Sequence, residues 1–138
     1  MEGTGAALHL SATRSATVLV PPEVLLAYVS DPLNLPAWAP EFAEEVSPAG
    51  DGTWALRSPE GERRILVRST LALGVVDFVS ATDPQWGAFM RVLPSGASSH
   101  VLFTLLFAAG TSERAVDEAM RGAAQELANL RTILERRP

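Results

Sequence analysis

The sequence predicts an α+β fold in which an antiparallel β-meander packs against one long C-terminal helix. Three observations support it. A single strand-like segment is followed by two short helices, turn signals then divide the middle of the chain into strand-length pieces, and residues 112–136 have helical periodicity. Because these elements follow one another without a linker or an internal repeat, we expect one domain.

The composition fits a single globular domain with apolar surface to spare. The chain has 138 residues, of which 47% are hydrophobic and only 20% are charged. A chain of this length buries roughly two-thirds of its unfolded surface, and about 25% charged residues is usual. With so few charged residues, the chain must bury apolar surface in a large core, in an apolar cavity or in a subunit interface. We expect residues 1–12 to form a flexible tail and residues 13–138 the domain.

Charge and cysteine content exclude several classes of function. The net charge is −5, and the 11 basic residues are scattered, which argues against nucleic-acid binding. There is no cysteine, and the only histidines are His9 and His100, so neither a disulfide framework nor a dedicated metal site is expected. No apolar run reaches about 18 residues, and residues 1–7 lack the features of a secretory signal. We therefore expect a cytoplasmic protein that needs no cofactor and does not insert into membranes.

The N-terminal third predicts one strand and two short helices. Residues 13–20 are rich in Thr, Val and Leu, as strands are. Pro22 suits the first turn of a helix, and apolar residues at helical spacing continue that helix to residue 30. Asp31 and Pro32 then predict the cap and first turn of a second short helix, whose apolar side contains Leu35, Trp38 and Phe42.

Turn signals divide the middle of the chain into six segments of strand length. Turns rich in Gly, Pro and Asp recur near residues 50–52, 58–61, 83–84 and 94–96. The spacing leaves no room for crossover helices, which predicts an antiparallel meander. The expected strands are Phe42–Ser47, Thr53–Arg57, Arg63–Ser69, Gly74–Ala81, Trp86–Leu93 and Ser99–Phe107.

The last segment, residues 112–136, predicts a long amphipathic helix. Three acidic residues lie early in this segment and three arginines lie late, which complements the helix dipole; they are Glu113, Asp117 and Glu118, and Arg131, Arg136 and Arg137. The apolar stripe spans too few heptads for a coiled coil, so packing on the sheet is the better interpretation. The stripe consists of Val116, Met120, Ala123, Leu127, Leu130 and Leu134.

Several short motifs, taken in this order, resemble the SRPBCC superfamily. The opening contains Pro22-Glu23-Val24, Tyr28, Asp31-Pro32 and Pro36-Ala37-Trp38-Ala39-Pro40. Residues 74–79, 90–94 and 99–107 are similar to bacterial polyketide cyclase/dehydrase-like members. The superfamily also contains START lipid-transfer domains and birch-pollen-allergen-like proteins. The resemblance covers about residues 13–136, and the order of the motifs is more specific than any one of them.

The resemblance implies a helix-grip fold. In that fold a curved antiparallel β-sheet is wrapped around the long C-terminal α-helix, and two short helices follow the first strand. It also implies an apolar cavity between sheet and helix, in which members bind lipids, sterols, polyketides or hormones. The fold implies a binding geometry but does not determine a reaction.

Three functions follow as hypotheses. The first is a carrier or sensor that binds a small hydrophobic ligand, such as a lipid, a polyketide or an aromatic molecule. The second is a polyketide cyclase or dehydratase that uses acid and base groups in the cavity. The third is a protein-interaction member, chaperone-assisting or ribosome-associated, with a closed cavity and an exposed apolar patch. The sequence contains no recognisable catalytic set, which favours a binding protein over an enzyme.

Asp77 and Arg91 are the first candidates for chemistry. Pairing their two strands about Asp83 puts Asp77 opposite Phe89 and Val75 opposite Arg91. Asp77 and Arg91 then share a face as diagonal neighbours. The pair is either a polar anchor in the cavity, orienting a carbonyl or carboxylate ligand, or a structural ion pair on the sheet.

The next hairpin extends this face. Pairing its strands about Gly96 puts Arg91 opposite Val101, which predicts that Phe103 lies on the same face as Asp77. The two faces of the meander are then both mostly apolar. One face must lie against the cavity and the long helix. The other, outer face also needs protection from solvent, and the simplest way to cover it is a homodimer formed through that outer face.

Three other residues are candidates for ligand binding or catalysis, and each also has a structural explanation. His100 is either a general base or a half-exposed strand residue. Tyr28 offers its hydroxyl to a ligand or to a backbone partner in the core. Trp38 packs the short helices on the sheet near the expected cavity entrance. The candidates for catalysis are Asp77, Arg91 and His100, and those for ligand binding are Tyr28, Trp38, Asp77, Phe89, Arg91, Phe103, Met120, Ala124 and Leu127.

Overall fold

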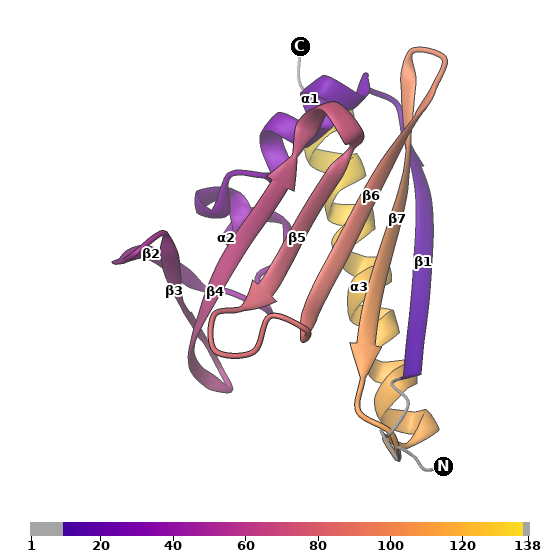
Figure 1. The fold of residues 1–138 in the computed structure, drawn as a ribbon. Helices are drawn as coiled ribbons and strands as arrows, with labels where there is room; N and C mark the ends of the chain where they lie inside the picture. The colour runs from indigo at the N-terminus through magenta and orange to yellow at the C-terminus, as the bar shows by residue number, and fades with distance from the viewer. Residues whose placement is uncertain (1–9, 137–138) are drawn as a thin grey trace.

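The computed structural model describes residues 10–136, in which a seven-stranded antiparallel sheet carries one long helix across one face (Figure 1). The order of the strands is β1-β7-β6-β5-β4-β3-β2. This is the helix-grip arrangement expected from the sequence. The strands are β1 (Leu10–Val18), β2 (Glu45–Gly50), β3 (Thr53–Ser58), β4 (Gly61–Thr70), β5 (Val75–Ser80), β6 (Gly87–Ser95) and β7 (Ser98–Phe107).

Short helices connect the strands at one side of the sheet, and the long helix closes the chain. The helices are α1 (Pro22–Val29), η1 (Pro32–Asn34), α2 (Leu35–Trp38), η2 (Leu71–Leu73) and α3 (Glu113–Glu135). Two of these helices are capped by side chains, and the cap predicted for Asp31 is confirmed. The Asp31 carboxylate accepts a hydrogen bond from the Leu33 amide at 3.0 Å, and the Ser112 hydroxyl accepts one from the Ala115 amide at 3.1 Å.

Two strands begin three residues away from their expected starts. β1 begins at Leu10, three residues before the expected start, because residues 10–12 pair with the end of β7. Residues 1–9 of the expected tail lie outside the described residues. β2 begins at Glu45 rather than Phe42, because residues 39–43 still form a turn after α2. Phe42 lies in this turn instead of in the sheet.

The register between β5 and β6 is the one predicted from the sequence. Val75 pairs with Arg91 and Asp77 with Phe89. Asp77 and Arg91 therefore share a face, and an Arg91 nitrogen donates a hydrogen bond to an Asp77 oxygen at 2.6 Å.

The predicted register between β6 and β7 is wrong by one residue. Ser95 pairs with Ser98, so the turn contains two residues, and Val92 rather than Arg91 lies opposite Val101. Gly96 has φ +62°, which suits the first central position of a two-residue hairpin turn. A shift of one residue moves every β7 side chain to the other face of the sheet.

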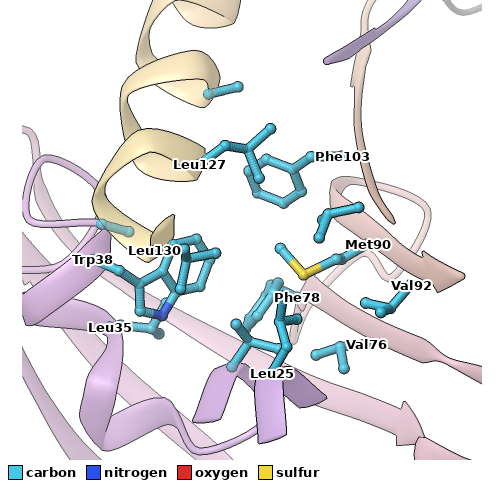
Figure 2. Close-up of a cluster of buried hydrophobic side chains, with 14 of the residues drawn as sticks. Leu25, Leu35, Trp38, Val76, Phe78, Met90, Val92, Phe103, Leu127 and Leu130 are labelled. Carbon is cyan, nitrogen blue, oxygen red and sulfur yellow. The ribbon is translucent and has the colours of Figure 1, made fainter. Parts of the chain in front are cut away.

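The sheet therefore has an inner face, covered by α3 and the short helices, and an outer face. The inner face carries Val76, Phe78, Met90, Val92, Val101 and Phe103, all buried. In Figure 2 the labelled side chains of the inner face converge with Leu127 and Leu130 from α3, Leu35 and Trp38 from α2, and Leu25 from α1; those of the inner face are Val76, Phe78, Met90, Val92 and Phe103. This cluster is the hydrophobic core.

The outer face combines an ion-pair network with apolar side chains. Asp77 is 7% exposed and lies 3.7 Å from Arg68 and 2.6 Å from Arg91. Because both arginine side chains stay about half exposed, their alkyl parts cover the sheet while their charges reach solvent. Around this network lies a row of half-buried apolar residues, consisting of Leu66, Val75, Phe89, Leu102 and Leu106.

Two hydrogen bonds fix α3 relative to the N-terminal part of the chain. The Asn129 side-chain amide donates to the carbonyl of Trp38 at 3.0 Å, which ties α3 to the end of α2. The Leu19 amide donates to the Glu135 carboxylate at 2.9 Å, which ties the last turn of α3 to the end of β1. The C-terminal half of α3 is thus held by buried leucines and by polar contacts.

Gly74→Ala tests the close approach between the η2 turn and β6. Gly74 has φ +70°, and a Cβ there would lie 2.2 Å from the Val92 carbonyl oxygen, a backbone atom. We expect a loss of about 3 kcal/mol or more in the free energy of unfolding, measured in urea. Gly110→Ala is the control, because its φ is +89° but a Cβ meets nothing within 4 Å. Equal losses in the two variants would contradict this account of Gly74.

Candidate functional site: a cavity between helix α3 and the sheet

A cavity of about 650 Å³ lies between the N-terminal half of α3 and the inner face of the sheet. Its walls come from α2 and the turn after it, the β3–β4 hairpin, β5 to β7, and α3. Its volume falls within the range of about 300–1,000 Å³ that is usual for small-molecule sites. The exposed residues Glu41, Glu60 and Glu118 lie on its rim, so one side opens to solvent.

Small residues on α3 create this space. Ala115, Ala119, Gly122 and Ala123 face the cavity from successive turns of the helix. A Cβ built on Gly122 would meet no atom within 4 Å. By contrast, the C-terminal half of α3 faces the sheet with buried leucines that fill the core. The C-terminal half of the helix therefore packs tightly on the sheet, whereas the N-terminal half places Met120 in the core and borders the cavity with small residues.

Aromatic side chains form much of the opposite wall. The deeper part holds Trp38, with its ring centroid 5.8 Å from that of Phe78 and 6.1 Å from that of Phe103. Phe42 and Trp86, both half-buried, line the cavity nearer its mouth. Tilted rings at these separations are a favourable aromatic arrangement and leave flat apolar surface for a ligand.

Glu126 is the most perturbed titratable group of the described residues. It lies on α3 in the cavity wall and is half-buried. Burial raises the pKa of its carboxyl to about 7, and the nearby Glu41 carboxylate adds to the rise. Glu126 can therefore gain or lose a proton near neutral pH, as a general acid or base must.

The cavity includes some of the ligand-binding residues predicted from the sequence and excludes others. Trp38 and Phe103 line it. Met120 and Leu127 are 1% and 2% exposed and fill the core beside it. Ala124 is exposed to solvent, because the small residues that face the sheet are its neighbours on the helix, Gly122 and Ala123. The placement predicted for Ala124 is wrong.

Asp77, Arg91 and Phe89 lie on the outer face, away from the cavity. The alternating side chains of β5 put Val76 and Phe78 in the core, so Asp77 must point the other way. The hypothesis of a polar anchor inside the cavity is therefore wrong for Asp77 and Arg91. The structure instead supports the alternative, a structural ion pair.

His100 and Tyr28 also lie outside the cavity wall. His100 is on the outer face, where its Nδ1 lies 3.4 Å from the Thr17 hydroxyl across the β1–β7 pair. Tyr28 is half-buried on α1 and packs against the core. Neither side chain lines the cavity, so neither is placed to act on a molecule bound there.

The sequence contains a signal for Glu126, which is absent from the candidates predicted above. Ala119, Gly122, Ala123 and Glu126 follow one another at helical spacings of three, one and three. This pattern puts three small residues and one carboxyl on a single helix face. Glu126 directly precedes the core residue Leu127. Because a carboxylate on an amphipathic helix is usually solvated, the helical pattern alone does not mark Glu126 as a cavity residue.

A second hollow lies at the opposite end of the sheet, between α1, η2 and the β6–β7 turn. It has a volume of about 980 Å³ and is lined by exposed leucines, including Leu71, Leu73 and Leu93. It contains no aromatic side chain, and its only ionisable residue is Glu23. The first cavity is therefore the better candidate for a small-molecule site.

Metal binding and membrane spanning find no support in the described residues. Between residues 10 and 136, no three His, Asp or Glu side chains gather in a way that would hold a metal ion. In the same range, no helix combines the length and apolar character needed to cross a bilayer.

Comparisons with known proteins identify relatives by structure alone. The sequence matches no protein-family model and no curated protein. Among solved structures, the ZhuI aromatase/cyclase from Streptomyces sp. R1128 is similar with a TM-score of 0.71 and 15% identity, covering 94% of this chain and 96% of that one. A START superfamily protein from Mycobacterium smegmatis has a TM-score of 0.67 and 15% identity, covering 91% and 97%.

A third similar structure is the Aha1 dimer from Colwellia psychrerythraea, with a TM-score of 0.66 and 16% identity, covering 86% of this chain and 92% of that one. At identities this low, the structural similarity establishes the fold, and the ligand and the reaction stay open. The chain therefore has the helix-grip fold that a START superfamily protein and an aromatase/cyclase also adopt.

Proposed function

We propose that the protein binds a small hydrophobic molecule in the cavity between α3 and the sheet, as a cytoplasmic carrier or sensor. The observation that supports this most directly is the cavity of about 650 Å³, with small residues on one side and aromatic rings on the other. Five aromatic side chains line it, which favours a ligand with an aromatic or otherwise flat apolar body.

The structural relatives agree with this proposal. One is described as an aromatase/cyclase and another as a START superfamily protein. The hypothesis of a protein-interaction role expected a closed cavity, whereas this cavity is open on one side. The second hollow, with its exposed leucines, is the feature that would serve such a role.

An enzyme of the cyclase or dehydratase type is the second candidate function, and Glu126 is the observation that favours it. Such a reaction needs a group in the cavity that exchanges protons near neutral pH. Glu126 meets this requirement through its raised pKa, whereas Asp77, Arg91 and His100 lie on the other face of the sheet. An enzyme of this kind would depend on Glu126, with Glu41 as its neighbour.

Gly122→Leu tests whether the cavity binds ligands. A leucine at Gly122 would project into open space and fill part of the cavity, and it also has a better helix propensity than glycine. We expect the variant to bind an uncharged environment-sensitive fluorescent probe such as N-phenyl-1-naphthylamine about ten-fold or more weakly, with no loss of stability.

The matched control is Ala124→Leu, which adds a leucine to the exposed side of the same helix. It should bind the probe as the original protein does. Equal probe binding by the Gly122 variant, the Ala124 variant and the original protein would place the probe elsewhere and contradict the proposal.

Glu126→Gln tests the raised pKa through its effect on stability. A carboxyl whose pKa rises from 4.5 to about 7 on folding destabilises the folded protein as pH increases through that interval. Below the interval the group is protonated in both states and the effect disappears. We expect the variant to be more stable than the original protein by about 1–2 kcal/mol at pH 8 and by little at pH 4.5, since solvent screens a half-buried carboxylate. Urea unfolding at both pH values checks this, and a pH-independent difference would show that the pKa is not raised.

We also propose a homodimer through the outer sheet face. The half-buried apolar row of Leu66, Val75, Phe89, Leu102 and Leu106 supports it, and one structural relative is described as a dimer. Light scattering after size-exclusion chromatography at tens of micromolar should give twice the monomer mass. Phe89→Glu should give the monomer, because it places two like charges in the interface. A monomer mass for the unsubstituted protein would contradict the proposed dimer.

A further inference from the structure

The rim of the cavity carries more negative than positive charge. Four carboxylates line it, from Glu41 after α2, Glu60 in the β3–β4 turn, and Glu118 and Glu126 on α3. Arg63 on β4 is the one cationic side chain among the lining residues. The interior beyond this rim is apolar and aromatic, so the site combines negative charge at its mouth with an uncharged, flat interior.

Local partners already neutralise half of these carboxylates. Arg63 lies 3.3 Å from Glu60, and its guanidinium also lies over the ring of Phe42 at 5.3 Å. Arg114 lies 3.5 Å from Glu118, one turn along α3. Both arginines are therefore committed to neighbours on the rim or just outside it.

Glu41 and Glu126 are left without a counter-charge. Within residues 10–136 neither has an ion-pair or hydrogen-bond partner, and the two carboxylates act on each other unfavourably. Glu126 is half-buried in a largely apolar wall, where an unpaired negative charge is costly. The site is thus electrostatically incomplete when both groups are ionised, and a cation between them would complete it.

The aromatic walls favour a particular kind of cation. An ammonium group attached to an apolar or aromatic body would place its charge beside the two carboxylates and its body against Phe42, Trp86, Phe78 and Phe103. Ring faces near the mouth add cation–π attraction. A carboxylate or phosphate ligand would instead meet two unpaired negative charges, and a neutral ligand would leave them unpaired.

We propose that this cavity selects organic amines, with the ammonium group held by Glu126 and Glu41 and the apolar body in the aromatic interior. The inference rests on the proposed function and adds the charge class of the ligand. It assigns Glu126 a role in specificity, whether the protein is a carrier or an enzyme.

Calorimetric titration with three ligands of one shape tests the proposal. The probes are 2-(1-naphthyl)ethylamine, 2-(1-naphthyl)ethanol and 1-naphthylacetate, which are cationic, neutral and anionic at about pH 8. We expect the amine to bind at least about ten-fold more tightly than the alcohol, and the carboxylate to bind most weakly. Glu126→Gln should remove most of the preference of the amine over the alcohol while leaving alcohol binding in place.

Asp117→Asn is the matched control, because Asp117 is exposed on α3 and does not line the cavity. It removes the same charge from the same helix, so a general effect of net charge would appear equally in both variants. Glu41→Gln provides a second variant and should reduce the preference for the amine by a smaller factor than Glu126→Gln, because Glu41 is more exposed.

The pH dependence gives an independent readout. The charged groups that line the cavity with Glu126 are Glu41, Glu118, Glu60 and Arg63, and burial raises the pKa of Glu126 to about 7. Affinity for the amine should therefore rise between about pH 5.5 and 8 as Glu126 loses its proton, while affinity for the alcohol stays constant.

The outcomes separate this inference from the proposed function. Equal binding of the amine and the alcohol, or tighter binding of the carboxylate, overturns the amine selectivity and leaves the hydrophobic site standing. Failure of all three probes to bind overturns both. A preference for the amine that survives Glu126→Gln and Glu41→Gln overturns the assignment of its cause to these two carboxylates.

Discussion

The packing of α3 on the inner face of the sheet is the constraint on which the other features depend. The C-terminal half of the helix presents Leu127, Leu130 and Leu134, which are almost fully buried. The N-terminal half presents alanines and a glycine and leaves a cavity. One helix thus closes the core and forms the wall of the candidate site, and the change from large to small side chains along its length determines where each role begins.

The sequence predicted the order of the elements and part of their register. Asp31 caps its short helix as expected, and the β5–β6 register is correct because the connection between the two strands is centred on Asp83, as the pairing from the sequence assumed. The β6–β7 register was not predictable from the same argument. Its turn contains Gly96 and Ala97, and a turn centred on Gly96 alone is equally compatible with the sequence.

That shift explains why the sequence grouped Phe103 with residues that lie on the outer face. With β7 displaced by one residue, Phe103 appeared to share a face with Asp77, whereas the structure places it beside Phe78 on the inner face. The predicted catalytic candidates all lie on strands, whereas the titratable group with a raised pKa in the cavity wall is Glu126, on a helix. Its raised pKa depends on burial by distant segments and on Glu41, and such proximity is a product of tertiary structure that local sequence patterns do not encode.

The uneven support of α3 has a mechanical consequence. Its C-terminal half is anchored by leucines, by the Asn129 hydrogen bond to α2 and by the Glu135 hydrogen bond to the end of β1. Its N-terminal half spans the cavity with small residues beneath it. Met120 places one large side chain of this half in the core, but no leucine anchors it. The turns of α3 beside the cavity are therefore held by fewer large side chains than the last turns. A ligand that displaces the turns beside the cavity disturbs less of the core than one that displaces the C-terminal turns.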